Sequence, residues 1–229
     1  MVLATFNESQ NIEHIISDLY RIIPAPLEII VVDDNSPDGT ADIVDNLDYP
    51  DLKLIRRVKK GLASAFYEGI IKSSGDIICW MDADGTMPVE TLKTMISHLD
   101  CYDIAIGSRY VRGGGDERSF LRVLASRFIN GMASFILKGD VKDYDSGFIA
   151  VNKSVFDRIV YKPYGYGEYF IEFVFDACRK NLKIVEVGFI FKERSQGKSK
   201  SMISIFSFLK LGLHYMIRIL KIKIFYILK

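Results

Sequence analysis

The sequence has few residues of the kinds that form disulfide frameworks, zinc sites or histidine-based catalytic sites. Its 229 residues include only three cysteines and three histidines. The cysteines lie far apart without metal-ligand spacing, so we interpret them as core residues of a protein from a reducing compartment. The histidines have no ligand or base partner in the sequence, and we interpret them as structural. The residues concerned are Cys79, Cys101 and Cys178, and His14, His98 and His214.

Targeting and repeat signals are also absent. We expect no signal peptide, because Met1 leads directly into a short predicted strand. No internal repeat, low-complexity run or clear linker precedes residue 200. Basic residues interrupt the apolar segment at 203–229, whereas a membrane-spanning helix needs about 20 predominantly apolar residues. We therefore expect one catalytic domain at residues 1–200, followed by a tail at 201–229 that is not a clean membrane span.

The formal net charge of +1 is unevenly distributed along the chain. Residues 192–229 contain nine basic residues and one acidic residue, a net charge of +8. The first 191 residues contain 21 basic and 28 acidic residues, a net charge of −7. An acidic body argues against general nucleic-acid binding, whereas a basic, apolar tail favours anionic surfaces. A membrane surface is therefore a more plausible partner than nucleic acid.

The spacing of apolar residues predicts alternating strands and helices in the first half of the chain. We expect strands at residues 1–5, 27–32, 52–56, 77–82 and 104–109, and helices at 11–23, 41–47, 62–73 and 88–99. The second half is less regular, with predicted helices at 118–137 and 166–179 and strands at 147–151 and 184–191. This order predicts an α/β fold in which helices cover both faces of a mostly parallel sheet.

Two carboxylates mark the end of the apolar strand predicted at 77–82. Asp82 and Asp84 lie where ligands collect in an open parallel sheet. Neighbouring carboxylates repel each other unless a cation joins them, and Mg²⁺ or Mn²⁺ takes carboxylate oxygens and bridges to substrate phosphates. The pair therefore predicts a metal-dependent enzyme that acts on a phosphorylated substrate. Short acidic pairs also occur at solvated loop starts, but the preceding strand favours function.

A second acidic cluster follows the strand predicted at 27–32. Acidic residues at this place in an α/β sheet often bind the ribose or base of a nucleotide, and we assign that role to Asp33 and Asp34. Asp38 and Thr40 are better explained by a turn and a helix cap. The two acidic clusters on one sheet are expected to converge on one crevice.

Arginines and a second acidic turn lie in the second half. Arg109, Arg122 and Arg127 could converge on a phosphate, for which the guanidinium group is well shaped. A solvated helix face explains Arg122 equally well. Asp143 and Asp145 lie in a tight turn before a strand, and the pattern alone favours the turn over a catalytic role.

Residues 203–229 are predicted to form an amphipathic helix. Polar residues fall on one stripe of a helical wheel, and apolar residues cover the wide remaining face. This pattern is typical of a helix lying in a membrane surface, where each basic residue near an anionic leaflet adds about 1 kcal/mol. A core-facing helix or a subunit contact would give a similar pattern. The stripe consists of Lys200, Ser204, Ser207, Lys210, His214, Arg218 and Lys221.

Seven segments match known motifs in order. The first four are residues 4–8 for P-T-Y-N-E, with Ala for Pro and Phe for Tyr, 33–40 for D-D-x-S-x-D-G-T, 60–65 for a slightly shifted K-x-G-L-G-x-A, and 82–84 for the D-A-D metal motif. The last three are residues 107–110 for G-S-R-Y, 143–148 for D-x-T-S-G-F, and 191–200 for F-x-x-R-x-x-G-x-S-K. Together they resemble family 2 glycosyltransferases of the Rossmann-like GT-A fold, most closely the dolichol-phosphate mannose synthase group. Asp145 occupies the Thr position of its motif, and Thr86 replaces a Gln that ligates the metal in some relatives.

The resemblance implies a binding site for a nucleotide-sugar donor. Glu8 and Asp34 would hold the base and the ribose of the nucleotide. Asp82 and Asp84 would hold Mg²⁺ or Mn²⁺ against the diphosphate. GDP-mannose and UDP-glucose are both compatible donors. The donor-binding set implied by the motifs also contains Ala4, Phe6, Asp33, Lys60 and Ala83.

The resemblance also implies positions for the acceptor and for a closing loop. Arg109 and Arg127 would bind the acceptor phosphate. Arg194 and Lys200 would close over the diphosphate from a glycine-containing loop. The expected enzyme lies peripherally on the cytoplasmic face of the membrane.

The implied reaction is an inverting transfer of a hexose, with mannose favoured over glucose, to a polyprenyl or dolichyl phosphate. A saccharide hydroxyl as acceptor is the alternative, and it would require a carboxylate base, with Asp143 or Asp145 as candidates. A receiver-like, Mg²⁺-binding signalling domain is a more distant alternative, as is a nucleotide-sugar-binding protein without turnover. The basic, apolar tail favours the lipid acceptor.

Overall fold

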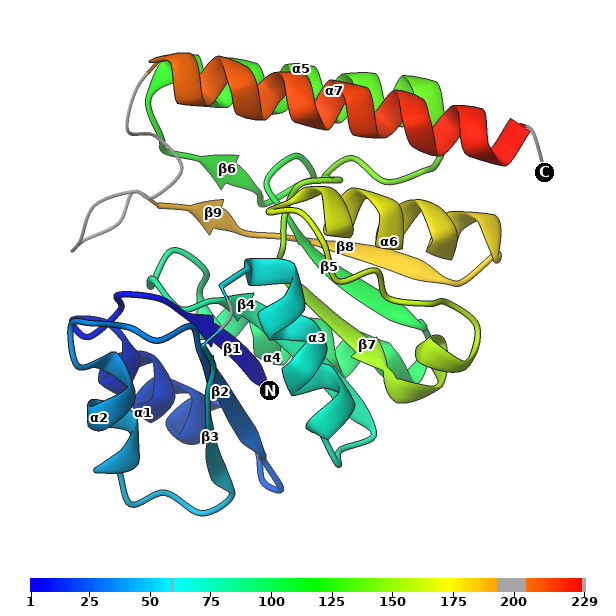
Figure 1. The fold of residues 1–229 in the computed structure, drawn as a ribbon. Coiled ribbons are helices and arrows are strands. Elements are labelled where there is room, and N and C mark those ends of the chain that lie inside the picture. The colour runs from blue at the N-terminus through cyan, green and yellow to red at the C-terminus, as the bar shows by residue number, and fades with distance from the viewer. Residues whose placement is uncertain (59, 193–204, 228–229) are drawn as a thin grey trace.

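A seven-stranded sheet forms the centre of the computed structural model, which describes residues 1–58, 60–192 and 205–227 (Figure 1). The strand order is β3-β2-β1-β4-β7-β5-β8. Neighbouring strands run parallel except at β7, which is antiparallel to both β4 and β5. The strands are β1 (Val2–Thr5), β2 (Ile29–Asp33), β3 (Leu52–Arg56), β4 (Ile77–Asp82), β5 (Ile104–Ser108), β7 (Ile149–Asn152) and β8 (Ile184–Gly188).

Helices cover both faces of this sheet, as the sequence predicts. One face packs against α1 (Ile12–Ile22), α2 (Thr40–Asp45) and α4 (Val89–Ser97). The other face packs against α3 (Leu62–Lys72) and α6 (Glu168–Arg179). Two short 3-10 turns, His98–Asp100 and Lys153–Asp157, connect elements at the edge of these layers. The inner strands are buried on both sides, which explains their near-continuous apolar sequences.

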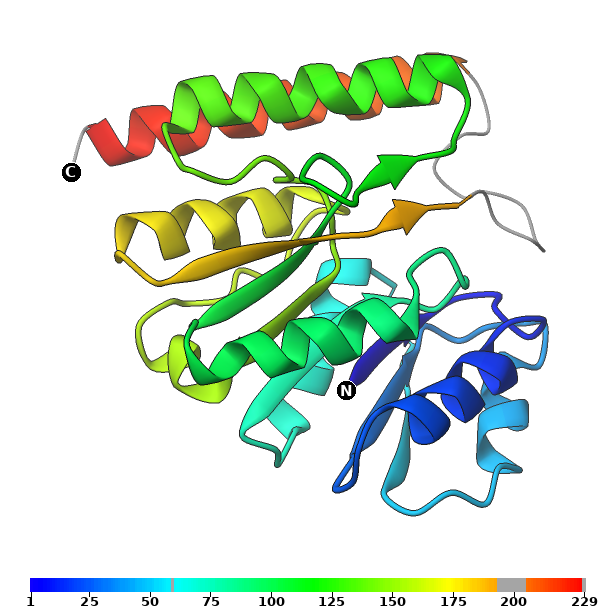
Figure 2. The ribbon, with the colours of Figure 1, turned by 180° about the vertical axis from the view of Figure 1, so that it is seen from behind.

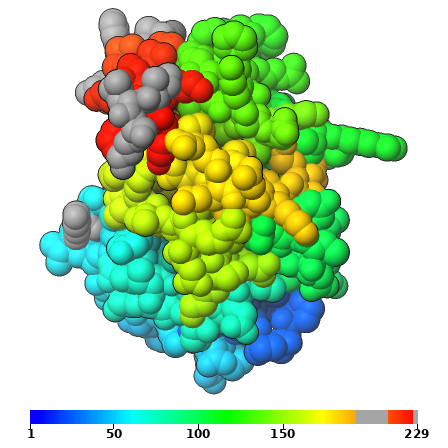
Figure 3. Space-filling model, turned by 90° about the vertical axis from the view of Figure 1, so that its right-hand side faces the viewer, coloured from blue at the N-terminus to red at the C-terminus, as the bar shows by residue number. Residues whose placement is uncertain are grey.

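Two long helices form a further layer on one end of the molecule. α5 (Phe120–Leu137) and α7 (Ile205–Ile227) lie side by side above α6 in both ribbon views (Figures 1 and 2). The space-filling view shows the same pair capping the molecule (Figure 3). α7 buries Tyr215, Ile219 and Ile222 in the same core cluster as α6. Its inner face is therefore part of the domain core.

The main differences from the predicted elements lie in the second half. The strand expected at 184–191 is two strands, β8 and β9 (Ile190–Phe191), and β9 pairs with β6 (Gly115–Asp116), which the apolar pattern does not predict. The division follows Gly188, where a Cβ would lie 2.4 Å from the carbonyl oxygen of Arg112. The loop at residues 112–114 passes so close to position 188 that a glycine is required there.

The antiparallel direction of β7 follows from the route that the chain takes between β5 and β7. The chain leaves β5 at the carboxyl edge of the sheet, and Gly107 N–H donates to the Phe148 carbonyl just before β7 begins. Because α5 remains at that edge, the chain re-enters the sheet from the same side and β7 must run antiparallel. The turn at 143–148 is thereby brought against the end of β5.

The register of the parallel strands places the predicted donor residues at one edge. Ala4 in β1 pairs with Asp82 in β4, and Thr5 pairs with Asp33 in β2. The carboxyl ends of these three strands are therefore adjacent, as expected for a ligand crevice in an open α/β sheet.

Packing of α3 against β1 gives a test of the core. A Cβ added to Gly69 would lie 2.2 Å from Cγ1 of the buried, β-branched Val2. We expect Gly69→Ala to lower the free energy of unfolding by about 1–3 kcal/mol through overpacking. Urea unfolding would measure this, and Val2→Ala should partly compensate in the double variant.

The control for this substitution is Gly212→Ala in α7, where no atom lies within 4 Å of the added Cβ. It should leave the free energy of unfolding unchanged or raise it by up to about 1 kcal/mol, because alanine favours helix more than glycine does. Equal urea midpoints for Gly69→Ala and the unsubstituted protein would contradict the packing argument.

Candidate active site

The D-x-D pair lies at the carboxyl end of β4, as the sequence predicts. Asp82 is the last residue of the strand and is half-buried, whereas Asp84 is buried in the following turn. The Thr86 amide and hydroxyl both donate to Asp84 Oδ1, at 3.1 and 2.6 Å. Thr86 therefore orients a carboxylate.

The donor chemistry of this pair fits a hard divalent cation. Within the described residues, no group of three or more His, Cys, Asp or Glu side chains gathers at one point. Mg²⁺ commonly binds through one or two carboxylates, with substrate phosphates and water completing the coordination. Two strand-end carboxylates therefore suffice when a diphosphate supplies further oxygens.

The two acidic residues after β2 both accept hydrogen bonds from protein groups. Asp33 accepts from the Thr5 hydroxyl at 2.8 Å and from the Ser36 amide at 2.8 Å, so it braces the turn. Asp34 accepts from Arg57 Nε and from the Gly61 amide, each at 2.6 Å. A nucleotide at Asp34 would therefore meet a carboxylate already paired with Arg57, a partner that the sequence patterns did not reveal.

The remaining predicted donor residues lie around the same edge. Glu8 is buried, and its Oε2 accepts from Asn11 Nδ2 at 2.9 Å. The Lys60 ammonium lies 4.0 Å from the centroid of the Phe6 ring, an arrangement that positions a cation beside the crevice. Ala4 and Ala83 are buried beside these groups.

The predicted turn precedes α2, whose N-cap residue is Gly39, and Asp38 bonds to the first residue of the helix. Asp38 Oδ1 accepts from the Thr40 amide at 3.1 Å and from the Thr40 hydroxyl at 2.5 Å. Asp38 Oδ2 also accepts from the Ser9 amide at 3.0 Å. These bonds hold the loop after β1 against the start of α2, which supports the structural interpretation of both residues.

A buried ion pair joins the end of β5 to the turn before β7. Arg109 Nε and Nη2 donate to the two oxygens of Asp143 at 2.8 and 2.6 Å, and the Arg109 amide donates at 2.9 Å. The two side chains are 3% and 0% exposed. Burial alone would lower the pKa of Arg109, but Asp143 raises that pKa well above its ordinary value. Arg109 is therefore charged and fixed in place.

Asp145 is the more accessible carboxylate of this turn. Its side chain is 21% exposed, and one oxygen lies 3.8 Å from Arg109 Nη2. Burial raises the pKa of Asp145, while Arg109 acts in the opposite direction. Because Asp143 already accepts from Arg109 through both oxygens, Asp145 is the better placed of the two candidate bases.

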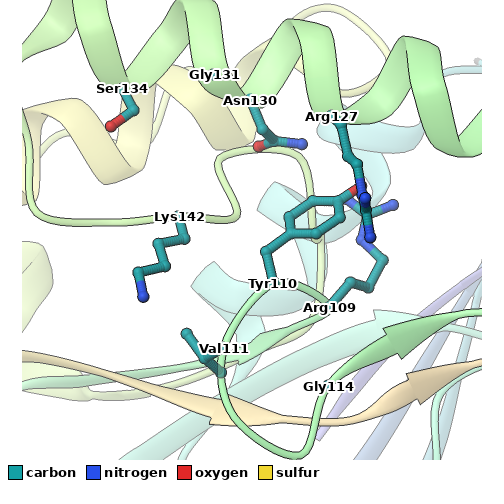
Figure 4. Close-up of a pocket in the computed structure, with 9 residues that line it drawn as sticks. All are labelled: Arg109, Tyr110, Val111, Gly114, Arg127, Asn130, Gly131, Ser134 and Lys142. Atoms are coloured by element: carbon teal, nitrogen blue, oxygen red, sulfur yellow. The ribbon is translucent and has the colours of Figure 1, made fainter.

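A cavity of about 540 Å³ lies between α5 and the segment that follows β5. Figure 4 shows Arg109, Tyr110 and Arg127 on one side and Lys142 across from them. Lys142 was not predicted as a site residue, because only the folded chain brings it to this cavity. Arg122 is not among the lining residues, which are Arg109, Tyr110, Val111, Gly114, Arg127, Asn130, Gly131, Ser134 and Lys142.

The cavity is positively charged on its solvent-facing side. Arg127 and Lys142 are exposed, and within the described part of the chain their side chains have no hydrogen-bonding or ionic partner. Their charges are therefore available to an anion, unlike that of Arg109. Arg194 and Lys200, expected to close over the diphosphate, lie outside the described residues.

Removal of the carboxylate from the buried Arg109–Asp143 pair should destabilise the fold. We expect Asp143→Ala to lower the free energy of unfolding by about 3–5 kcal/mol, because the Arg109 charge would remain buried without its partner. Chemical denaturation measures this loss. Asp18→Ala, which removes an exposed pair with Arg21, should have no measurable effect. Similar urea midpoints for the two variants would show that the Arg109–Asp143 pair contributes little.

Comparison with known proteins relates this architecture to one family. A family model described as Glycosyl transferase family 2 matches residues 1–160. The dolichol-phosphate mannosyltransferase of Pyrococcus furiosus is 38% identical over 208 residues, which cover 87% of this chain and 58% of that protein. The polyprenol monophosphomannose synthase of Mycolicibacterium smegmatis is 31% identical over 211 residues, covering 87% of this chain and 79% of that protein. The chain thus spans less than two thirds of the first relative.

Solved structures of more distant sequence share the fold. The glucosyl-3-phosphoglycerate synthase of Mycobacterium tuberculosis, in complex with Mn²⁺, UDP-glucose and phosphoglyceric acid, superimposes with a TM-score of 0.73 at 17% identity, over 97% of this chain and 78% of that one. The same enzyme with Mg²⁺ and UDP gives a TM-score of 0.72 at 17% identity, over 96% of this chain and 77% of that one. These matches confirm the predicted GT-A-like fold.

The family match covers the strands that carry the acidic clusters and the turn at 143–148. It agrees with the motif resemblance and leaves the receiver-like alternative without support. With two relatives above 30% identity, the chain belongs to glycosyl transferase family 2.

Proposed function

We propose that the chain transfers a mannosyl group from a nucleotide-sugar to a polyprenyl phosphate at a membrane surface. The observation that carries this proposal is the cationic cavity beneath α5, a helix that also carries exposed apolar side chains. The names of the two relatives refer to dolichol phosphate and to polyprenol monophosphomannose. These names support a polyprenyl phosphate as the acceptor here.

The donor would lie across the carboxyl ends of β1, β2 and β4. Glu8 and Asp34 are assigned to the nucleoside, with Asp33 bracing the turn beneath it. Asp82 and Asp84 are assigned to Mg²⁺ or Mn²⁺, which when bound would neutralise negative charge on the departing diphosphate. GDP-mannose is the favoured donor because the names of both relatives refer to mannose, and UDP-glucose is the competing one.

The acceptor phosphate would enter the cavity beneath α5. Arg127 and Lys142 offer exposed positive charges there, and the fixed Arg109 guanidinium lines the inner wall. Guanidinium groups match the geometry of phosphate oxygens, so this wall can orient an acceptor oxygen. Orientation of a reacting group toward its target is a large part of catalysis.

The proposed reaction is a single in-line displacement. An acceptor phosphate oxygen attacks the anomeric carbon, the bond from that carbon to the diphosphate breaks, and the nucleoside diphosphate leaves. One displacement inverts the anomeric configuration, as is the rule for family 2. A phosphate monoester has a second pKa of about 6, so it is mostly dianionic at pH 7 and needs no general base.

A saccharide hydroxyl acceptor would instead require a base. Asp145 is then the candidate, because Asp143 is held by Arg109. The cavity argues for the anionic acceptor, since a neutral sugar would leave the charges of Arg127 and Lys142 without a partner. The lipid phosphate is therefore the first proposal and the saccharide the second.

Membrane contact is proposed for the outer face of the α5–α7 layer. Within the described residues, α5 is the helix whose length and hydropathy would suit a membrane span, with 28% of it buried. It lies along α7, however, and contributes Arg127 to the cavity, so we propose that it lies in the interface. The exposed apolar side chains of the layer are Phe120, Leu121, Leu124, Phe128 and Phe135 in α5, and Leu213, Ile217, Leu220, Ile224 and Phe225 in the described part of α7.

The structure differs from the polar stripe predicted for the tail in the position of Arg218. Arg218 does not face outward, because its guanidinium forms an ion pair with Glu172 of α6. His214 and Lys221 remain exposed beside the apolar residues. We therefore propose that α7, the described part of the tail predicted at 201–229, forms a membrane-facing surface together with α5, and that the rest of the catalytic domain predicted at 1–200 lies beneath the two helices.

Transfer assays test the reaction. We expect labelled mannose from GDP-mannose, with Mn²⁺ present, to appear on polyprenyl phosphate. Asp82→Asn and Asp84→Asn should reduce the rate on the order of 10²–10³-fold, because they remove charge that stabilises the leaving group. Asp76→Asn, at the opposite end of β4 and exposed, should leave the rate unchanged. Label found only on free sugars would overturn the lipid acceptor.

Liposome flotation tests the membrane surface. Phe128, 63% exposed on α5, is replaced by Glu, and Ile71, 59% exposed on α3, serves as the matched control. A Phe side chain that leaves the apolar phase loses about 1.5–3 kcal/mol, so Phe128→Glu should lower partitioning into anionic vesicles about tenfold or more. Ile71→Glu should not. If both variants float like the unsubstituted protein, this surface does not contact the lipid.

A further inference from the structure

Three consecutive backbone amides, at the start of the turn before β7, are held by side chains from two other elements. The Lys142 and Asp143 amides donate to the two carboxyl oxygens of Glu186 at 2.9 and 3.0 Å. The Tyr144 amide donates to Asn130 Oδ1 at 2.6 Å. Glu186 belongs to β8, whereas Asn130 belongs to α5. The turn is thus attached to the sheet on one side and to α5 on the other.

The side-chain amide of Asn130 has a partner at each end. Asn130 is 2% exposed, and its Nδ2 donates to the Ser126 carbonyl, one helical turn earlier, at 2.9 Å. This bond directs Oδ1 toward the Tyr144 amide. Asparagine is a poor helix former, and a buried amide is costly without partners. The contact with the turn therefore accounts for a buried asparagine in the middle of α5.

A second hydrogen bond attaches α5 to the segment that follows β5. The Tyr110 hydroxyl donates to Ser126 Oγ at 2.9 Å. Tyr110 immediately follows Arg109, and Tyr144 immediately follows Asp143. The two bonds therefore connect α5 to both sides of the buried Arg109–Asp143 pair, and the position of the helix is defined relative to that pair.

The position of α5 determines where Arg127 lies. Arg127 is three residues before Asn130, on the same face of the helix, and both line the cavity. Lys142, across the cavity, begins the run of three amides held by Glu186 and Asn130 (Figure 4). The contact between α5 and the turn thus sets the separation of the two exposed cations of the cavity.

We propose that Asn130 is a positioning residue of the acceptor site. Its hydrogen bond to the Tyr144 amide fixes α5 on the turn, and thereby fixes Arg127 at a set position across the cavity from Lys142. This inference rests on the proposed function, which assigns the acceptor phosphate to this cavity. Charge-assisted hydrogen bonds act at about 2.7–2.9 Å, so two cations reach one phosphate only when their separation is held.

Steady-state kinetics of Asn130→Leu tests this role, because leucine is similar in size and lacks the amide. We expect the KM for polyprenyl phosphate to rise about tenfold, equivalent to about 1.4 kcal/mol. The KM for the nucleotide-sugar should change by less than about twofold, as expected for a separate site on β1, β2 and β4. Partial unfolding would lower the apparent kcat without this difference between the two KM values, because KM does not depend on the concentration of folded enzyme.

Asn152→Leu is the matched control. The Asn152 amide also bonds to backbone, donating to the carbonyls of Leu99 and Tyr102, but Asn152 pairs with Ile77 at the opposite end of β4 from Asp82. Asn152→Leu should leave both KM values within about twofold of the unsubstituted protein. A rise in acceptor KM equal to that of Asn130→Leu would overturn the proposal, because any loss of a buried amide would then have the same effect.

A double-mutant cycle with Arg127 separates positioning from direct binding of the phosphate by Asn130. In an Arg127→Met background, Asn130→Leu should raise the acceptor KM by less than about threefold, because the group that it positions has lost its charge. An undiminished tenfold rise would show that Asn130 does not act through Arg127. If Asn130→Leu does not fold, the same cycle is measured with Asn130→Ser, whose side chain is too short to hold the Tyr144 amide in the same way.

Hydrogen exchange of the Tyr144 amide, followed by NMR without substrate, keeps this test distinct from that of the proposed function. We expect Asn130→Leu to speed this exchange about tenfold or more relative to the Asp143 amide, which Glu186 holds. If the unsubstituted protein transfers no sugar to polyprenyl phosphate, the proposed function fails while exchange still reports the contact. If transfer occurs and the acceptor KM of the Asn130 variant stays within about twofold of the unsubstituted value, the positioning role is wrong.

Discussion

The ion pair between Arg109 and Asp143 is the contact on which the second half of the site depends. It joins the end of β5 to the turn before β7, and three hydrogen bonds connect the two residues. Because both side chains are buried, each charge requires the other, and the turn cannot move without exposing one of them. The same turn carries Asp145 and is preceded by Lys142. The buried pair therefore fixes the wall of the cavity as well as the core beneath it.

Residues of opposite charge lie in two separate regions of the molecule. The acidic residues lie at the carboxyl ends of β1, β2 and β4, where a nucleotide diphosphate and a divalent cation can be accommodated. The cationic residues lie beyond β5 and on α5, around the cavity to which the proposed function assigns the acceptor phosphate. This division is consistent with a transfer between two phosphorylated substrates.

The α5–α7 layer links the cationic cavity to the proposed membrane surface. Each of the two helices has an outer apolar face and an inner face that carries polar side chains toward the domain. Arg127 extends from α5 to the cavity, while Tyr215 of α7 is buried beside Gly167 at the start of α6. A lipid-linked phosphate that approaches along the outer face would need to travel only past α5 to reach the cationic wall. The enzyme could thus bind its acceptor without withdrawing the lipid chain from the bilayer.

The sequence by itself determined the alternation of strands and helices, the strand-end position of Asp82 and Asp84, and the family, because apolar periodicity and motifs are local properties of the chain. It could not determine that Asp34 pairs with Arg57, that β7 runs antiparallel, or that Arg218 turns inward to Glu172. Those outcomes depend on contacts between residues far apart in the chain. Lys142 and Tyr215 lie in segments whose local pattern is that of a turn and of an amphipathic helix, respectively. Only the packing of α5, α6 and α7 over the sheet brings Lys142 to the cavity beneath α5 and buries Tyr215 beside the start of α6.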